Sequence, residues 1–277
     1  MRMTEIGAFH WRLTILCCCV VLMCCQATWA TDASSAVADS SPEPPAERFD
    51  PVVKEIEGWT VHVDPALLDG EHAEVGSRAL AMLGNHLQRI AVLLPPDRLE
   101  KLQQMELWIE HAHPTLGAMQ YHPDRKWLED HGHDPRLAKK VHITRAEQLL
   151  SRAQMLKHPA VILHELAHAY HDQALGFDDP RLIKLYKKAM DAGLYDRVLL
   201  YNGQRVRHYA ATDHKEYFAE GTEAFLYRND FYPFVAAELA EHDSDLYKLL
   251  EEIWGPLHKS APKADNRRDG SEATASE

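Results

Sequence analysis

The chain has 277 residues, with 42 Asp and Glu against 30 Lys and Arg, and a formal net charge of −12 at pH 7. Such an acidic chain is a poor candidate for binding nucleic acid or anionic lipid, because that binding depends on clustered Lys and Arg. The length is sufficient for one domain with a good-sized hydrophobic core.

The N-terminus has the three parts of a secretory signal peptide. Arg2 and Arg12 precede an apolar run at 13–23, which a stretch of small residues follows. This pattern predicts a signal at 1–30 and a secreted or periplasmic protein. The run is too short to span a bilayer comfortably, and no second long apolar segment follows, so we expect no integral membrane span after signal removal. A retained membrane anchor and a lipid-modified Cys24 are the alternatives.

The composition also divides the rest of the chain. All five cysteines lie inside the predicted signal, so the mature chain is expected to have no disulfide and no thiolate ligand. Residues 31–50 are rich in Ser, Ala, Pro and acid and predict a disordered linker, and the tail at 259–277 has the same character. The folded domain is therefore expected at 51–258.

The first half of this domain predicts strands and one long helix. The sequence WTVHV at 59–63 alternates as a half-buried strand does. A helix is predicted at 71–94, where apolar residues recur at helical spacing until Pro95 stops it. Two further strands are predicted at 105–109 and 141–144.

The second half predicts mostly helices, and strands followed by helices indicate an α+β fold with a small mixed sheet. An Asn-Gly pair between two strand-like runs is a strong hairpin signal. The elements predicted here are a helix at 145–156, an apolar helix that Pro159 opens and Gly176 closes, a helix at 180–192, a hairpin around Asn202 and Gly203, a helix from Asp213, and further helix to 257.

The apolar helix contains the motif HELAH. On a helix, His164 and His168 project from one face a turn apart and can bind one metal ion. Glu165 lies one position round, from where its carboxylate can act as general base on a metal-bound water without being a ligand. The surrounding residues are uncharged and apolar, so we expect these histidines to be buried with a metal as partner. Two core histidines satisfied by hydrogen bonds are the alternative.

A catalytic zinc ion needs a third protein ligand, and without cysteine this must be a carboxylate or another histidine. Glu216 and Glu220 lie four apart on the helix EYFAEGTEAF and share one face. Glu216 is the predicted ligand, with Glu220 hydrogen-bonded to a ligand imidazole. Alternatively, Asp213 and Glu216 form a helix capping box, and Glu220 is then the ligand.

The segments HELAHAYHD and HYAATDHKEYFAE resemble the gluzincin metallopeptidases, and among them the group similar to the protease domain of anthrax lethal factor. The resemblance covers 141–228 and implies a zincin-like domain, one Zn²⁺ per chain, and a peptide or protein substrate. It also implies that Glu216 is the third zinc ligand and that Tyr209 donates a hydrogen bond to the developing oxyanion. By the same resemblance, strand 141–144 is the edge on which an extended peptide lies.

The position of Tyr209 also favours a role at the metal site, because this residue ends the predicted hairpin just before the predicted ligand helix. The alternative is a tyrosine that only packs. His171 is expected to be a neighbour of the site or a surface residue. Six further histidines lie between His111 and His142, and their irregular spacing predicts a solvated surface loop beside the cleft. A second metal site is the alternative there. The six are His111, His113, His122, His131, His133 and His142.

The residues are consistent with three functions. The first is an exported zinc metallopeptidase, in which Glu165 activates a zinc-bound water. The second is a catalytically inactive binding module that zinc stabilises, for which removal of zinc should unfold the domain and loss of Glu165 should do nothing. The third is metal storage or sensing by the histidine-rich region, which needs several ions per chain. The general base, the third ligand and the tyrosine together favour the first.

Overall fold

The computed structural model describes residues 48–257, all of which belong to one compact unit. The predicted signal at 1–30, most of the linker at 31–50 and the tail at 259–277 lie outside the described residues. Residues 48–50, which composition assigns to the linker, lie against the domain: the Phe49 ring packs on Trp108 with 5.6 Å between ring centroids. Phe49 therefore packs with the domain, although it lies before residue 51.

The described residues form a mixed α+β fold with a five-stranded sheet in the order β1-β2-β3-β5-β4. β1 pairs antiparallel with β2 and β4 pairs antiparallel with β5, whereas the β2–β3 and β3–β5 pairs are parallel. The strands are β1 (Val52–Ile56), β2 (Trp59–Val63), β3 (Leu107–Ile109), β4 (Gln120–Tyr121) and β5 (Val141–Ile143). β4 is therefore an edge of the sheet and β5 is interior, so the expectation that strand 141–144 is the edge was wrong.

The strand predictions at 59–63, 105–109 and 141–144 are confirmed within two residues. In β2, Trp59, Val61 and Val63 are buried and the residues between them are more exposed, as the alternation predicts. β1 and β4 were not predicted. β1 is exposed along almost its whole length, so it shows no alternation, and β4 has only two residues.

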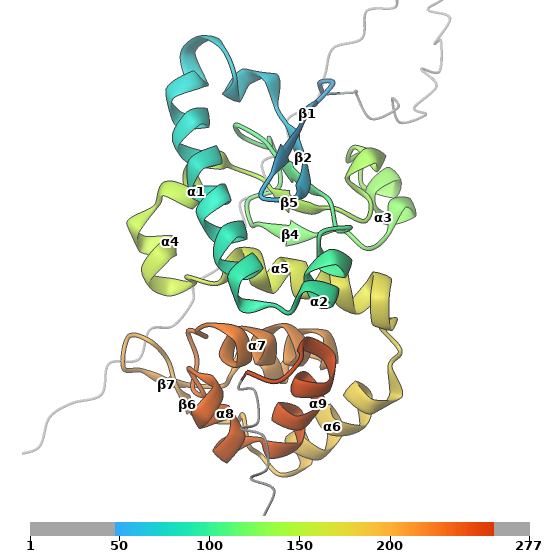
Figure 1. Cartoon of the computed structure of the whole chain (residues 1–277), viewed down its shortest axis with the longest axis vertical. Coiled ribbons are helices and arrows are strands. Elements are labelled where there is room, and N and C mark those ends of the chain that lie inside the picture. The colour runs from blue at the N-terminus through green and yellow to red at the C-terminus, as the bar shows by residue number, and fades with distance from the viewer. Residues whose placement is uncertain (1–47, 258–277) are drawn as a thin grey trace, which may run out of the picture. The chain divides into compact units, whose positions relative to one another are not determined.

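Helix α1 (Ala73–Leu93) covers the sheet (Figure 1), close to its predicted span of 71–94. Two short helices, α2 (Pro96–Leu102) and α3 (Arg125–Asp130), were not predicted. The helix predicted at 145–156 is two pieces, a 3-10 turn at Ala146–Leu150 and α4 (Arg152–Lys157). They separate at Ser151, whose hydroxyl caps α4 by accepting a hydrogen bond from the backbone N–H of Gln154.

The motif helix α5 (Val161–Tyr170) lies between the sheet and the C-terminal helices (Figure 1). It packs against β4 and β5 on one side and against α7 on the other. The remaining elements are α6 (Pro180–Asp191), the hairpin β6 (Val198–Leu199) and β7 (Arg205–Val206), α7 (His214–Leu226), α8 (Ala236–His242) and α9 (Ser244–Trp254). The predicted hairpin is confirmed, with Gly203 in its turn at φ 89°.

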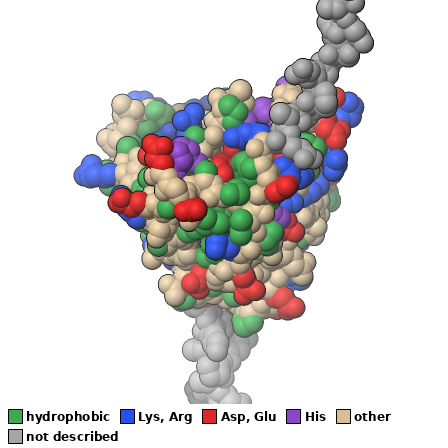
Figure 2. All heavy atoms as spheres, turned by 90° about the horizontal axis from the view of Figure 1, so that it is seen from above, with side chains coloured by type: hydrophobic (Ala, Val, Ile, Leu, Met, Phe, Trp, Pro, Cys, Tyr) green, Lys and Arg blue, Asp and Glu red, His purple; other side chains and the backbone are tan. Residues whose placement is uncertain are grey.

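Within residues 48–257, no helix is both long and apolar enough to cross a bilayer. The face seen from above in Figure 2 has hydrophobic side chains gathered near its centre, with acidic and basic side chains distributed around them. Mixed charge of this kind differs from the single-sign basic field that attracts nucleic acid.

Candidate metal centre

Three side chains from two helices meet where α5 packs against α7. His164 and His168 lie on successive turns of α5, and Glu216 lies in the first turn of α7. The Nε2 atoms of the two histidines are 3.1 Å apart. The Glu216 Oε2 atom lies 3.2 Å from Nε2 of His164 and 3.3 Å from Nε2 of His168. Three potential ligand atoms thus form a nearly equilateral triangle.

This triangle fits a single metal ion. Ligand atoms about 2.0–2.1 Å from a tetrahedral zinc ion are separated from one another by about 3.3–3.4 Å. Oε2 of Glu216 is buried and accepts no hydrogen bond from the described residues, so it is free to coordinate. The two imidazoles hold the pKa of Glu216 well below its usual range despite the opposing effect of burial. The donor set of two imidazoles and one carboxylate is one that zinc accepts.

The geometry distinguishes Glu216 from Glu220. The Asp213 carboxylate caps α7 by accepting hydrogen bonds from the N–H groups of Lys215 and Glu216, at 2.8 and 3.0 Å. The Glu216 carboxylate does not turn back to complete a capping box, because it faces the histidines instead. Glu220 lies deeper, with Oε1 4.0 Å from Nδ1 of His164, which is too far for a hydrogen bond.

Glu223 takes the position that the sequence assigned to Glu220. Its Oε1 atom accepts hydrogen bonds from Nδ1 of His164 at 2.6 Å and from Nε2 of His158 at 2.9 Å, and the side chain is fully buried. A second group that could hold a metal, His158, His164 and Glu223, consists of these same contacts and shares His164 with the first. The two short hydrogen bonds indicate a carboxylate that orients the ligand imidazole. Its signal in the sequence is a third glutamate two turns after Glu216.

Replacing Glu223 with Gln is expected to lower the affinity of this candidate site for a divalent metal ion such as Zn²⁺ by about 10- to 100-fold, because the amide is a weaker acceptor for the Nδ1–H group of His164. Competition with a chromogenic chelator measures this affinity. The matched control is Glu220→Gln on the same helix, which should change the affinity much less. Equal losses in the two variants would contradict the assignment of the orienting role to Glu223.

Glu165 lies beside the triangle and is not part of it. It is 7% exposed, and its Oε2 atom accepts a 2.8 Å hydrogen bond from the backbone N–H of Tyr121 in β4. Burial raises the pKa of Glu165, which His164 and His168 oppose. A desolvated carboxylate next to the triangle, bonded to a backbone N–H and not part of the triangle, is suited to accept a proton.

Tyr209 begins a 3-10 turn, Tyr209–Ala211, between the hairpin and α7. Its side chain is 48% exposed, and the charge of Glu216 together with burial raises the pKa of its hydroxyl. The structure thus brings Tyr209 close to the triangle but shows no hydrogen bond from its hydroxyl.

A cavity of about 740 Å³ lies at the triangle. The triangle, Glu165 and Tyr209 line it. Tyr121 of β4 forms one wall of the cavity, and Phe177, in the segment after α5, forms another. Leu200 and Phe231, near the hairpin, complete it. The segment between His168 and Glu216 therefore forms part of the cavity wall, through Phe177 and Leu200.

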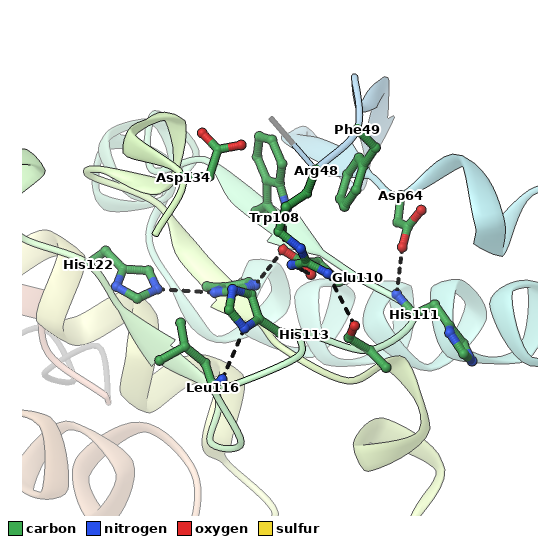
Figure 3. A network of polar contacts seen from close by, with 12 residues as sticks. Arg48, Phe49, Asp64, Trp108, Glu110, His111, His113, Leu116, His122 and Asp134 are labelled. Atoms are coloured by element: carbon green, nitrogen blue, oxygen red, sulfur yellow. Dashed lines mark hydrogen bonds and ion pairs between the residues drawn. The ribbon is translucent and has the colours of Figure 1, made fainter. Parts of the chain in front are cut away.

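The histidine-rich region differs from its prediction. His113, His122 and His142 are buried, each 3% exposed or less, so the interpretation as a solvated loop was wrong for these three. Figure 3 shows His113 and His122 in a polar network, to which His142 belongs through two ring contacts. Nε2 of His142 lies 3.1 Å from Oε1 of Glu110, and its Nδ1 atom lies 3.1 Å from Nε2 of His122.

This network does not have the arrangement of a second metal site. Nδ1 of His113 accepts hydrogen bonds from the N–H groups of Thr115 and Leu116, at 3.2 and 3.0 Å. Its proton is therefore on Nε2, which leaves that atom no lone pair for a metal. Within residues 48–257, no histidine of this region belongs to a group that could hold an ion.

The centre of the network is Glu110, a buried carboxylate at the end of β3. It accepts hydrogen bonds from His142, from Nε1 of Trp108 at 3.2 Å, and from Arg48 (Figure 3). The second Arg48 Nη atom donates to the carbonyl of Ala112 at 3.2 Å. These contacts attach the N-terminal segment to the sheet.

His171 is fully buried, and neither of its ring nitrogens has a hydrogen-bond partner. Of the two alternatives for His171, a neighbour of the site or a surface residue, its burial excludes the second. Burial lowers its pKa to about 3. Below the unfolded value of 6.5, the unfolded chain therefore takes up a proton that the folded chain does not, and stability decreases as the pH falls.

We expect the free energy of unfolding to decrease from pH 7 to pH 5, and His171→Phe to reduce that decrease by about 1–2 kcal/mol. Urea denaturation at each pH measures it. The exposed His131, replaced in the same way, is the control and should leave the decrease unchanged. An equal decrease in the free energy of unfolding from pH 7 to pH 5 in wild type and His171→Phe would contradict the proposed effect of His171.

No model of a protein family, no curated protein and no solved structure matches the chain.

Proposed function

We propose that this protein is an exported zinc metallopeptidase, in which His164, His168 and Glu216 bind one Zn²⁺ and Glu165 acts as general base. The observation that carries the proposal is the triangle of three ligand atoms, 3.1–3.3 Å apart, with the Glu165 carboxylate beside it in the same cavity. A purely structural histidine pair would need neither the converging Glu216 nor a buried Glu165.

The proposed family is the gluzincins, with a zincin-like fold similar to the protease domain of anthrax lethal factor. Two features support it: the motif helix α5 packs under a mixed sheet, and the third ligand comes from the helix that packs on its other side. The resemblance of the motifs at 141–228 to this family also supports the assignment.

Bound zinc would lower the pKa of a coordinated water and polarise the peptide carbonyl. Glu165 accepts the proton of the attacking water and can deliver it to the leaving amine. Tyr209 is half exposed and lines the same cavity, and its hydroxyl donates a hydrogen bond to the carbonyl oxygen as negative charge develops there. Glu223 keeps the proton of His164 on Nδ1, so that Nε2 presents its lone pair.

The substrate class follows from the edge of the sheet. β4 forms one wall of the cavity and, within residues 48–257, pairs with one strand, β5. The Tyr121 N–H on its other side is bonded to Glu165, so an extended peptide would lie along this edge and bond to the carbonyl group of Tyr121. The predicted signal at 1–30 supports action outside the cytoplasm.

Metal content tests the proposal directly. Elemental mass spectrometry of the purified mature chain should find one zinc per chain, and Glu216→Ala should lose it because the third ligand is gone. Glu220→Ala is the matched control and should retain most of the zinc. A zinc-free wild type would overturn the proposal. A zinc-loaded wild type that cleaves no peptide, and that unfolds when zinc is removed, would instead support the inactive binding module.

A further inference from the structure

The helix that carries the HELAH motif ends irregularly. Its last turn, His171–Leu175, is π-helical. Such turns are rare, insert one additional residue into a helical turn, and frequently occur at functional sites. Here the turn buries His171 without a hydrogen-bond partner, at a cost to stability, and presents Asp172 and Gln173 to the edge of the sheet.

Asp172 and Gln173 tether strand β4. Oδ2 of Asp172 accepts hydrogen bonds from Oη of Tyr121 and from Nζ of Lys139, both at 2.6 Å. Nε2 of Gln173 donates to Oη of Tyr121 at 3.1 Å and to the carbonyl of Lys139 at 3.2 Å. Lys139 itself has a φ of 63°, which non-glycine residues rarely adopt. A strained backbone and a π-helical turn thus meet at one set of contacts, as is common where function constrains structure.

The tethered strand directs one N–H group at Glu165. The N–H of His122 donates to the carbonyl of Lys140 in the neighbouring chain segment, at 3.1 Å. Successive residues of an antiparallel strand turn their N–H groups to opposite sides, so the N–H of Tyr121 faces the open side. There it donates to Oε2 of Glu165 at 2.8 Å.

We propose that Asp172 is a positioning residue, which fixes Tyr121 of β4 so that the Tyr121 N–H group orients the Glu165 carboxylate. The proposal rests on the proposed function, in which Glu165 is the general base. β4 has only two residues and, within residues 48–257, one strand neighbour. The Tyr121 ring is packed in the core, and the contacts of Asp172 and Gln173 are what fix its hydroxyl end. Asp172 acts through Tyr121.

The first test measures how strongly these contacts protect the Tyr121 amide from hydrogen exchange, and it does not depend on hydrolysis. Asp172→Asn removes the charge, and Tyr121→Phe removes only the hydroxyl. Hydrogen exchange of the Tyr121 amide, in the zinc-loaded mature chain, should become about tenfold faster in both variants, which corresponds to the loss of one hydrogen bond. The control is Tyr195→Phe, which loses a buried hydroxyl bonded to Asp243 in the helical part. Unchanged exchange in Asp172→Asn would overturn the proposal.

The second test distinguishes positioning from a purely structural role. With a peptide substrate, Asp172→Asn and Tyr121→Phe should lower kcat by about tenfold or more and change KM little, because a displaced base affects the chemical step. Faster exchange with unchanged kcat would also overturn the proposal. If the wild type cleaved no peptide, the proposed function would fail, and the exchange rates would still decide whether Asp172 fixes Tyr121.

Discussion

Replacing Glu165 with Gln is expected to lower kcat for peptide hydrolysis by about 10²- to 10⁴-fold while one zinc per chain stays bound. Glu165 lies next to His164 on α5, but its carboxylate is bonded to the Tyr121 N–H and is outside the triangle of ligand atoms. The amide of Gln has a similar shape and cannot accept the proton. Kinetics on a peptide substrate and elemental analysis of the same sample measure both quantities.

The control for this variant is Glu147→Gln, an exposed glutamate in the turn before α4 that should leave both quantities unchanged. Two outcomes contradict the assigned role. Undiminished hydrolysis would show that Glu165 is not the base, and loss of zinc together with activity would show that it supports the metal instead.

The second large effect concerns stability. Replacing Arg48 with Met should lower the free energy of unfolding by about 2–3 kcal/mol. The Glu110 side chain is 2% exposed, and Arg48 is the cation bonded to it, beside Trp108 and His142. Breaking a buried ion pair costs about 3–5 kcal/mol, and we take a smaller value because the Arg48 side chain is 24% exposed. Urea denaturation measures the difference.

Arg145→Met, at an exposed arginine, is the matched control and should change the free energy of unfolding by less than about 0.5 kcal/mol. Adding Glu110→Met to Arg48→Met should recover part of the lost free energy of unfolding, since the buried carboxylate that has lost its arginine is then removed. Similar losses for Arg48→Met and Arg145→Met would contradict the role of the pair. If the prediction holds, a chain that starts at residue 51 lacks part of its fold.

Much of the site follows from local periodicity in the sequence. Residues four apart on a helix share a face, so the spacing of His164 and His168 was sufficient to predict two convergent imidazoles. The same argument selected the face of α7 that carries Glu216. The alternating residues of β2 and the Asn-Gly turn of the hairpin are likewise local signals, and both elements are observed.

Other features depend on contacts between segments far apart in the chain. Glu216, Glu220 and Glu223 lie on one side of α7, and only the packing of α7 against α5 decides which of them reaches each nitrogen of His164. Likewise, the order of the strands makes β4 the edge. No local pattern encodes these distances.

The HELAH helix, the helix that carries Glu216 and the hairpin could be predicted from the sequence, because a period of 3.6 or 2 residues and a turn preference are properties of neighbouring residues. The hydrogen bond from His164 to Glu223, the burial of His113, His122 and His142, and the pairing of Arg48 with Glu110 emerge only from the folded chain. The reason is physical: burial and hydrogen bonding depend on which surfaces meet, and the spacing of residues along one helix or strand does not specify its partner.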